Sequence, residues 1–421
     1  MRLRFTSPFN LHGFYGRKAL SFFVSLLLLV ILFSSCVVSV FDVRFPSFVS
    51  GTSDIVVNNE FELRNAVNNA VKPIVIALNC DIALTAPLVI SVNKDITLTS
   101  IKTSGFFKLV GGNRASASNE HNYPEAVITV EGGAVLRLDC IAVTCVGYTW
   151  NKIVRVDVCG TLILYNGELS GNNFGDCVVN SGMFEMYGGK ISNNNAQAGY
   201  GGGVYNSEYG TFSMSGGEIS NNIGFGVYNR RVLDRSGSFE LSGGVIRNNG
   251  GGVQNSGIFS MSGGEISNNV GENGGGVQNS GVFSMSGGKI SNNQAVKGGG
   301  VYNYPIGNFS LSGKGVISNN EAEVGGGVYN AGIFNRCDGV ISDNTAAQYD
   351  NVCSPNGVGE LPDGNGGSSD ENNELSDMNG FSLKDIVVIT CVGVTVVVVS
   401  VVGVLFLYLQ KRKSCLASKK T

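Results

Sequence analysis

One pattern repeats between residues 166 and 344: Gly-Gly-Val-Tyr/Gln-Asn, then Phe-x-Met/Leu, then Ser-Gly-Gly-x-Ile-Ser-Asn-Asn. The isoleucine of the last block marks the period at Ile191, Ile219, Ile246, Ile266, Ile290, Ile317 and Ile341. The six intervals between the first and the last span 150 residues, an average of 25. A fixed period of roughly 20 to 50 residues is typical of a solenoid, in which each repeat packs against its neighbours. The repeat therefore predicts a solenoid.

Each copy holds three short blocks in which apolar residues alternate with polar ones, the period of a β-strand. Phe and Met or Leu stand two apart and so share one face, here the interior; the pairs are Phe184/Met186, Phe212/Met214, Phe239/Leu241, Phe259/Met261, Phe283/Met285 and Phe309/Leu311. A helical repeat is disfavoured, because each glycine would weaken a helix by roughly 1 kcal/mol. We predict an all-β fold, a right-handed parallel β-helix with about three strands per coil over residues 54–353.

Asparagines recur at two corners of each copy. One series is Asn206, Asn229, Asn255, Asn279, Asn303 and Asn330, and the other consists of pairs such as Asn193-Asn194, Asn268-Asn269 and Asn292-Asn293. Asn tolerates left-handed backbone conformations, and amides stacked at the strand spacing can bond from coil to coil. Calcium-binding repeats carry an Asp in each turn instead, and a nucleotide site needs one glycine loop before one helix. We therefore predict structural ladders and expect no metal and no cofactor.

Residues 54–177, which precede most of the regular repeats, follow the same pattern less regularly. Strand-like runs lie at residues 73–78, 88–92, 95–99, 126–130 and 135–138. Before them, Asn59 and Glu62 resemble a capping box. Apolar residues at helical spacing follow, namely Phe61, Leu63, Ala66, Val67 and Ala70. We predict a short helix that caps the open end of the solenoid.

Two apolar stretches bracket the repeats. Residues 19–41 are uncharged and follow Arg17 and Lys18, an arrangement typical of an export signal, so we expect residues 1–44 to be a signal peptide or an uncleaved signal anchor. Residues 386–409 are uncharged and precede a Lys-Arg-Lys run. This pattern predicts a transmembrane helix at residues 385–410 and a cytoplasmic tail at residues 411–421.

The charges that flank these stretches predict the topology. Because Lys and Arg accumulate on the cytoplasmic side, both basic flanks are expected inside and the repeats outside the cell. Residues 354–384 hold Gly, Asn, Ser and acidic residues with little to bury, and we expect a flexible acidic stalk there. The net charge of −3 offers no basic footprint for nucleic acid. We predict a single-pass cell-membrane protein whose β-helix is extracellular and binds no nucleic acid.

Export also permits covalent modification of the repeats. Seven cysteines fall in the exported part: Cys80, Cys140, Cys145, Cys159, Cys177, Cys337 and Cys353. We predict a disulfide between Cys337 and Cys353, since both lie where the last coil needs closing, whereas spacing leaves the pairing of the other five open. Asn308 begins an Asn-Phe-Ser sequence and is a candidate glycosylation site.

With these repeats in view, residues 54–353 resemble the pectin-lyase-like right-handed β-helix superfamily, and the repeats look most like those of adhesin-like surface proteins of archaea and bacteria. The Gly-Gly-x-Ile blocks are also similar to chlamydial polymorphic outer-membrane repeats, although the partner Phe-x-x-Asn motif is absent. The resemblance implies a fold and no single activity, because the superfamily holds lyases, hydrolases and non-catalytic binders.

Hydrolases of that superfamily use clustered aspartates with a Gly-His-Gly segment, and lyases use calcium-holding aspartates with an Arg or Lys base. The two histidines, His12 and His121, do not lie in such a segment, and we identify no catalytic residue. A polysaccharide lyase or glycoside hydrolase remains the alternative if acidic and basic side chains converge in an open groove. The candidates for that cluster are Asp139, Asp157, Asp176, Arg137 and Arg155.

The loops after the corner asparagines differ in length, and function on a solenoid is found in insertions along one edge. The step to the next Phe is four residues at Asn255 but ten at Asn229. An aromatic and cationic strip on this edge suits glycans or acidic surfaces, and ordinary solvated loops are the alternative. The candidate ligand-binding residues are Arg230, Arg231, Arg235, Tyr209 and Tyr304. We therefore predict a membrane-anchored, adhesin-like binding scaffold directed toward glycans.

Overall fold

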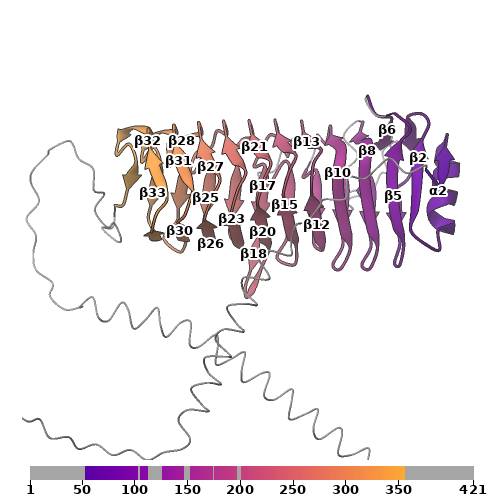
Figure 1. The fold of residues 1–421 in the computed structure, drawn as a ribbon, viewed down its shortest axis with the longest axis horizontal. Helices are drawn as coiled ribbons and strands as arrows, with labels where there is room; N and C mark the ends of the chain where they lie inside the picture. The colour runs from indigo at the N-terminus through magenta and orange to yellow at the C-terminus, as the bar shows by residue number, and fades with distance from the viewer. Residues whose placement is uncertain are drawn as a thin grey trace, which may run out of the picture. The chain divides into compact units, whose positions relative to one another are not determined.

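The computed structural model describes residues 53–102, 105–111, 126–146, 152–173, 175–196 and 201–355. In this part of the chain, strands pair in parallel with their counterparts one coil away, and the coils stack in one row (Figure 1). The predicted parallel β-solenoid is confirmed. Residues 1–44, the stalk beyond residue 355, the predicted transmembrane helix at 385–410 and the tail at 411–421 lie outside the described residues. No helix within the described ranges is long and apolar enough to span a membrane.

The first wall of the solenoid, called the Phe wall here, carries the Phe and Met or Leu series. Its strands are β1 (Ile55–Val57), β2 (Ile74–Leu78), β5 (Asp95–Ser100), β8 (Val135–Cys145), β10 (Thr161–Ser170), β12 (Met183–Met186), β15 (Thr211–Met214), β20 (Ser238–Leu241), β23 (Ile258–Met261), β26 (Val282–Met285), β30 (Asn308–Leu311) and β34 (Ile333–Arg336).

The second wall, the Ile wall, carries the isoleucine series. Its strands are β3 (Ile82–Leu84), β6 (Lys108–Gly111), β13 (Lys190–Ser192), β16 (Glu218–Ser220), β21 (Val245–Arg247), β24 (Glu265–Ser267), β27 (Lys289–Ser291), β31 (Val316–Ser318) and β35 (Val340–Ser342). The long strands β8 and β10 run through the bend and belong to both walls, which makes the two walls one 21-stranded sheet.

The third wall, the Val wall, is a separate 11-stranded sheet that carries the valines of the Gly-Gly-Val-Tyr/Gln-Asn block. Its strands are β4 (Leu88–Ile90), β7 (Ile128–Val130), β9 (Val154–Val156), β11 (Val178–Asn180), β14 (Val204–Asn206), β17 (Val227–Asn229), β22 (Val253–Asn255), β25 (Val277–Asn279), β29 (Val301–Asn303), β33 (Val328–Asn330) and β37 (Val352–Cys353). The three walls agree with the prediction of about three strands per coil, one for each short block of the repeat.

The last coils add a short fourth wall that the sequence analysis did not anticipate. It consists of β28 (Gln294–Lys297), β32 (Glu321–Val324) and β36 (Thr345–Gln348), which pair in parallel. The only apolar residue that these strands share at equivalent positions is an inward alanine, at Ala295, Ala322 and Ala346. That one small residue gives no alternating pattern, which is why the sequence did not reveal the wall.

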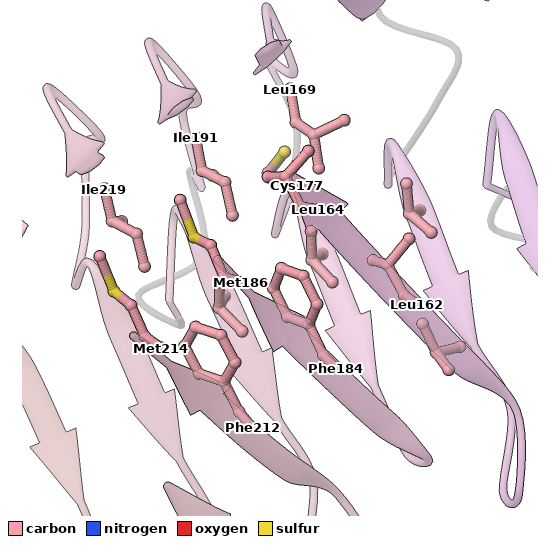
Figure 2. Close-up of a cluster of buried hydrophobic side chains, with 14 of the residues drawn as sticks. Leu162, Leu164, Leu169, Cys177, Phe184, Met186, Ile191, Phe212, Met214 and Ile219 are labelled. Carbon is pink, nitrogen blue, oxygen red and sulfur yellow. The ribbon is translucent and has the colours of Figure 1, made fainter. Parts of the chain in front are cut away.

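The interior is built from stacks of identical side chains. From Phe184 to Phe334, successive Phe rings of the Phe wall lie 4.6–4.9 Å apart and nearly parallel. That distance is the spacing of paired strands, so the rings repeat with the backbone. Figure 2 shows Phe184 and Phe212 beneath Met186 and Met214, with Ile191 and Ile219 facing them from the Ile wall. All six of these side chains are fully buried.

Two buried asparagine ladders hold the corners, as predicted. The first ladder joins Asn180 to Asn330 through amide-to-carbonyl bonds of 2.7–2.8 Å between adjacent coils. The second joins Asn194 to Asn344 through bonds of 2.9–3.1 Å. In each Asn-Asn pair only the second residue enters the ladder, while the first, such as Asn268, adopts a left-handed φ of 55–58°. The asparagines therefore support the backbone.

The helix α2 (Glu60–Asn69) lies at the N-terminal end of the row of coils (Figure 1). Asn59 caps it by accepting from the Glu62 amide at 2.9 Å, and the Asn59 side chain donates back to the Glu62 carboxylate at 2.8 Å. Leu63 and Val67 are buried as predicted, but Phe61 is 73% exposed. Phe61 falls outside the i, i+3, i+4 stripe that begins at Leu63, so its place on the buried face was predicted wrongly.

The disulfide between Cys337 and Cys353 stays a prediction. Cys337 follows β34 on the Phe wall and is exposed, whereas Cys353 ends β37 on the Val wall and is buried. The other five cysteines of the described residues are free thiols. At the glycosylation candidate Asn308, on β30, the side-chain oxygen is buried and has no hydrogen-bond partner within the described residues. Glycosylation of Asn308 stays a prediction.

Candidate ligand-binding face

The outer face of the Val wall carries one side chain per coil in a straight row. From β14 to β33, each strand of this wall has three residues, of which the first, a valine, and the last, an asparagine, are buried, so the middle residue points outward. Parallel pairing in register places these middle residues side by side from coil to coil. The row, called the Tyr/Gln ladder here, consists of Tyr205, Tyr228, Gln254, Gln278, Tyr302 and Tyr329.

The four tyrosines of the Tyr/Gln ladder form two stacked pairs. The ring centroids of Tyr205 and Tyr228 lie 5.3 Å apart with an interplanar angle of 21°, and those of Tyr302 and Tyr329 lie 5.0 Å apart at 3°. Burial between neighbouring rings raises the pKa of Tyr205 and of Tyr302, so both phenols stay neutral at physiological pH. The row therefore presents phenol hydroxyl groups and the two glutamine amides between them.

The longest insertion folds as an antiparallel hairpin, β18 (Arg231–Val232) and β19 (Arg235–Ser236), which projects from the stack of coils (Figure 1). At its base, Arg230 donates to the Tyr205 hydroxyl, and its Nε lies 3.9 Å from the Glu208 carboxylate. The Arg235 guanidinium lies 4.7 Å from the centre of the Tyr209 ring. Arg230, Arg235 and Tyr209 therefore gather beside the first tyrosine pair.

Two of the predicted residues lie apart from that group. Arg231 Nε donates to the Leu233 carbonyl at 3.1 Å, within the hairpin itself. Tyr304 packs edge-on against Tyr302 at 4.6 Å, and its hydroxyl lies 2.5 Å from Gln278 Nε2. Tyr228 and Tyr302 are separated by three strand steps, or ~14 Å at about 4.8 Å per step. Of the five predicted residues, three thus lie at the first tyrosine pair and Tyr304 lies at the second, whereas Arg231 bonds within the hairpin.

The Tyr/Gln ladder, which connects the two tyrosine pairs, was not predicted from the sequence. Its signal was the variable fourth residue of the Gly-Gly-Val-Tyr/Gln-Asn block. That residue was assigned no role from the sequence, whereas the alternation that buries Val204 and Asn206 places Tyr205 outside. Ligand binding was expected in the insertions, and the regular repeats between them were interpreted as a structural scaffold only.

The candidates for the enzyme alternative lie in separate places. Arg137 pairs with Asp95 across adjacent strands of the Phe wall. Asp139 lies at the bend of β8, where burial raises the pKa of its carboxyl. The Cys140 thiol donates to that carboxylate, with Sγ 3.4 Å from Oδ1. On the Val wall, Arg155 Nε lies 3.0 Å from Asp157 Oδ1. The Phe-wall pair and the Val-wall pair therefore do not converge on one groove.

Asp176, the remaining candidate, immediately precedes Cys177 and β11. Burial raises the pKa of its carboxyl to about 7, and the nearby Lys152 opposes that rise. One of its oxygens is buried without a hydrogen-bond partner among the described residues. Lys152 has its own pKa lowered by burial and by Arg155. Asp176, Lys152 and Arg155 thus form a small titratable cluster at the N-terminal part of the Val wall.

Within the described ranges, no three His, Cys, Asp or Glu side chains are placed to share a metal ion. No model of a known protein family matches the chain, and no curated protein or solved structure matches it either. The features that bear on function are therefore the side chains of the Val wall and the sequence itself.

Proposed function

We propose that this protein is a single-pass cell-membrane protein that displays a right-handed β-helix of the pectin-lyase-like type outside the cell, as an adhesin-like scaffold that binds glycans. The apolar stretches at residues 19–41 and 386–409 and their basic flanks support the membrane topology. The binding role is supported by one observation, the Tyr/Gln ladder on the outer face of the Val wall.

The side chains of the Tyr/Gln ladder match the chemistry of a sugar chain. A sugar ring presents apolar C–H groups and many hydroxyls, and Tyr offers both an apolar body and a hydrogen-bonding tip. Gln254 and Gln278 add amides that donate and accept. Since the ladder repeats at every strand for six coils, its ligand is an extended chain that lies along the solenoid axis.

Cations near the first tyrosine pair favour an acidic glycan. Arg230, Arg231 and Arg235 are exposed on or beside the hairpin, against the two carboxylates of Glu208 and Asp234. Arg230 and Arg235 are already held beside aromatic rings, so they need little reordering to contact a carboxylate or a sulfate. The hairpin is therefore the anionic end of the proposed binding face.

Binding of the full-length protein in detergent micelles to an array of immobilised neutral and acidic polysaccharides tests the proposal. Replacing both Tyr228 and Tyr302 by Ala should weaken binding at least about tenfold, equivalent to about 1.4 kcal/mol. The matched control replaces Tyr165 and Tyr187, a stacked pair 5.4 Å apart outside the Val wall, and should leave binding unchanged. Equal losses in both double variants, or no binding by the parent protein, would remove the proposal.

The topology is tested separately in cells that express the chain. Cys159 and Cys337 are exposed on the solenoid, so a maleimide that cannot cross membranes should label them in intact cells. An epitope fused after residue 421 should become accessible to antibody only after permeabilisation. A single-pass topology with the solenoid outside would be contradicted if intact cells exposed both the solenoid cysteines and the C-terminal epitope, or if they exposed neither.

The enzyme alternative keeps one specific observation, the cluster of Asp176, Lys152 and Arg155 on the Val wall. A carboxyl group with a pKa of about 7 next to basic side chains is a candidate general acid or base near neutral pH. Polysaccharides bound in the array assay should then be shortened over time, with new reducing ends or unsaturated products. That shortening should be lost on Asp176→Asn, while binding is retained.

A further inference from the structure

The C-terminal end of the Tyr/Gln ladder opens into a small cavity between the Val wall and the fourth wall. Its volume is about 280 Å³, and its lining includes Lys297, Tyr329, Gln348, Tyr349 and Ser354. Small-molecule sites begin at roughly 300 Å³, so the cavity has room for one sugar ring and not for a chain. It lies at the far end of the ladder from the Arg230 hairpin, because Tyr329 is the last tyrosine of the row.

Tyr349 occupies a backbone position that earlier coils reserve for glycine. Lys297, Val324 and Gln348 are equivalent by register, and the residue after each has a left-handed φ. These residues are Gly298 at 64°, Gly325 at 67° and Tyr349 at 60°. Bulky residues rarely adopt this conformation, and such outliers concentrate at functional sites. The last coil thus holds an aromatic ring in the cavity wall at the expense of a strained backbone.

A second observation independently points to a polar ligand. Ser354 lines the cavity, and its hydroxyl oxygen is buried and has no hydrogen-bond partner within the described residues. Buried polar groups are normally satisfied, so a hydroxyl in this state indicates a missing partner. A ligand hydroxyl in the cavity would supply that partner, and the Gln348 amide offers a further donor and acceptor.

Lys297 supplies the charge of the site. Its Nζ lies 5.5 Å from the centre of the Tyr329 ring. Within the described part of the chain it forms no ion pair, whereas Arg230 and Arg247 each have a carboxylate partner. An ammonium beside the Tyr329 ring, in a cavity also lined by Tyr349 and Ser354 and without a carboxylate partner among the described residues, matches a ligand that carries the carboxylate itself.

We infer that this cavity binds a single carboxylated sugar residue. Its carboxylate pairs with Lys297, its ring packs between Tyr329 and Tyr349, and its hydroxyls bond to Ser354 and Gln348. The inference rests on the proposed glycan-binding function and extends it by naming the residue that the C-terminal end of the ladder would take, whether free or at the end of a chain.

The test uses D-glucuronate and D-glucose, which differ in the charge at one carbon, with the full-length protein in detergent micelles. Saturation-transfer NMR and calorimetry should give a dissociation constant for glucuronate at least tenfold below that for glucose. Lys297→Met should abolish this preference, whereas Lys314→Met, at an exposed lysine on another part of the surface, should keep it. A disaccharide that ends in glucuronate should bind as tightly as free glucuronate if chain ends are accepted, and more weakly if the site takes only the free sugar.

Tyr349→Gly is the sharpest variant, because glycine is the residue that this position has in the preceding coils. The variant should keep the parent melting temperature and bind glucuronate at least tenfold more weakly. Unchanged glucuronate affinity in Tyr349→Gly, or equal affinity of the parent for glucuronate and glucose, overturns the inference. These outcomes are independent of the Tyr228 and Tyr302 variants, which report on polysaccharide binding along the ladder.

Discussion

The rings of Phe259 and Phe283, one coil apart, lie 4.6 Å from centre to centre with an angle of 5° between their planes. Both are fully buried, and each also stacks on the ring of its other neighbour, Phe239 or Phe309. A residue in the middle of this stack therefore supports two coils at once. Its loss cannot be absorbed by one flexible neighbour, because the backbone spacing fixes the rings on both sides.

Removal of one ring from the stack should destabilise the solenoid strongly. Phe259→Ala should lower the free energy of unfolding by about 3–5 kcal/mol, since it removes an aromatic side chain and leaves a cavity between two rings. The control Glu265→Gln, on the outer face of the adjacent strand in the same coil, should change it by less than about 1 kcal/mol. Denaturant unfolding of both variants decides the matter, and small losses in both would mean that the Phe stack contributes little.

The two asparagines of the Asn268-Asn269 pair should behave in opposite ways. Asn269 donates 3.0 Å bonds to Asn293 and to the Ile246 carbonyl and accepts from Asn249, all of them buried. Asn269→Ala leaves those partners unsatisfied and should cost about 2–4 kcal/mol. Asn268 is exposed at a φ of 55°, so Asn268→Gly should be nearly neutral. If thermal unfolding shows comparable losses of stability in both variants, the buried ladder does not contribute the predicted stability.

The Asp176 carboxyl should make stability depend on pH below neutrality. Its pKa is raised to about 7 in the folded state from a usual value of 3.8, so between these values the folded chain holds a proton that the unfolded chain has released. The free energy of unfolding should therefore fall as pH rises from about 4 to about 7, by at most roughly 4 kcal/mol at about 1.36 kcal/mol per pH unit. The slope should shrink in Asp176→Asn, and a slope unchanged by that variant would exclude Asp176 as its source.

The three walls could be predicted from the sequence because one residue of each wall recurs once per coil. Phe184 to Phe309 and Val204 to Val328 recur at one position per coil, and a period-two alternation fixes which side faces inward. The fourth wall was not predictable, because Ala295 and Ala322 carry too little hydrophobic signal. The pKa of Asp176 was not predictable either, since it depends on burial by residues distant in the chain.

Individual residues of the candidate site could be predicted from the sequence, but the outward row that joins them could not. The insertion at Arg230 and the tyrosines at 209 and 304 stand out because they break the repeat. Tyr228 and Gln254 do not, because they belong to it, and only the register of the Val wall shows that they form one outward row. Tyr349 is a similar case, since its strain is visible only once Gly325 is known to be its equivalent.

The hairpin offers a deletion that separates binding from stability. Removal of residues 231–236 joins Arg230 to Gly237, whose amide already donates to the Arg230 carbonyl at 2.7 Å. The step from Asn229 to Phe239 then equals the four-residue step that follows Asn255. Leu233, the largest apolar residue at the tip, is 86% exposed, so little buried surface is lost and the melting temperature should change by less than about 2 °C.

Arg231 and Arg235 leave with the hairpin, and binding of acidic polysaccharides should weaken about tenfold while binding of neutral ones is kept. The single variant Asp234→Asn, which retains both arginines and removes a carboxylate, should instead strengthen acidic binding slightly. If the deletion lowers the melting temperature by many degrees, the hairpin is part of the scaffold, and if acidic binding is unaffected, its arginines do not contact the ligand.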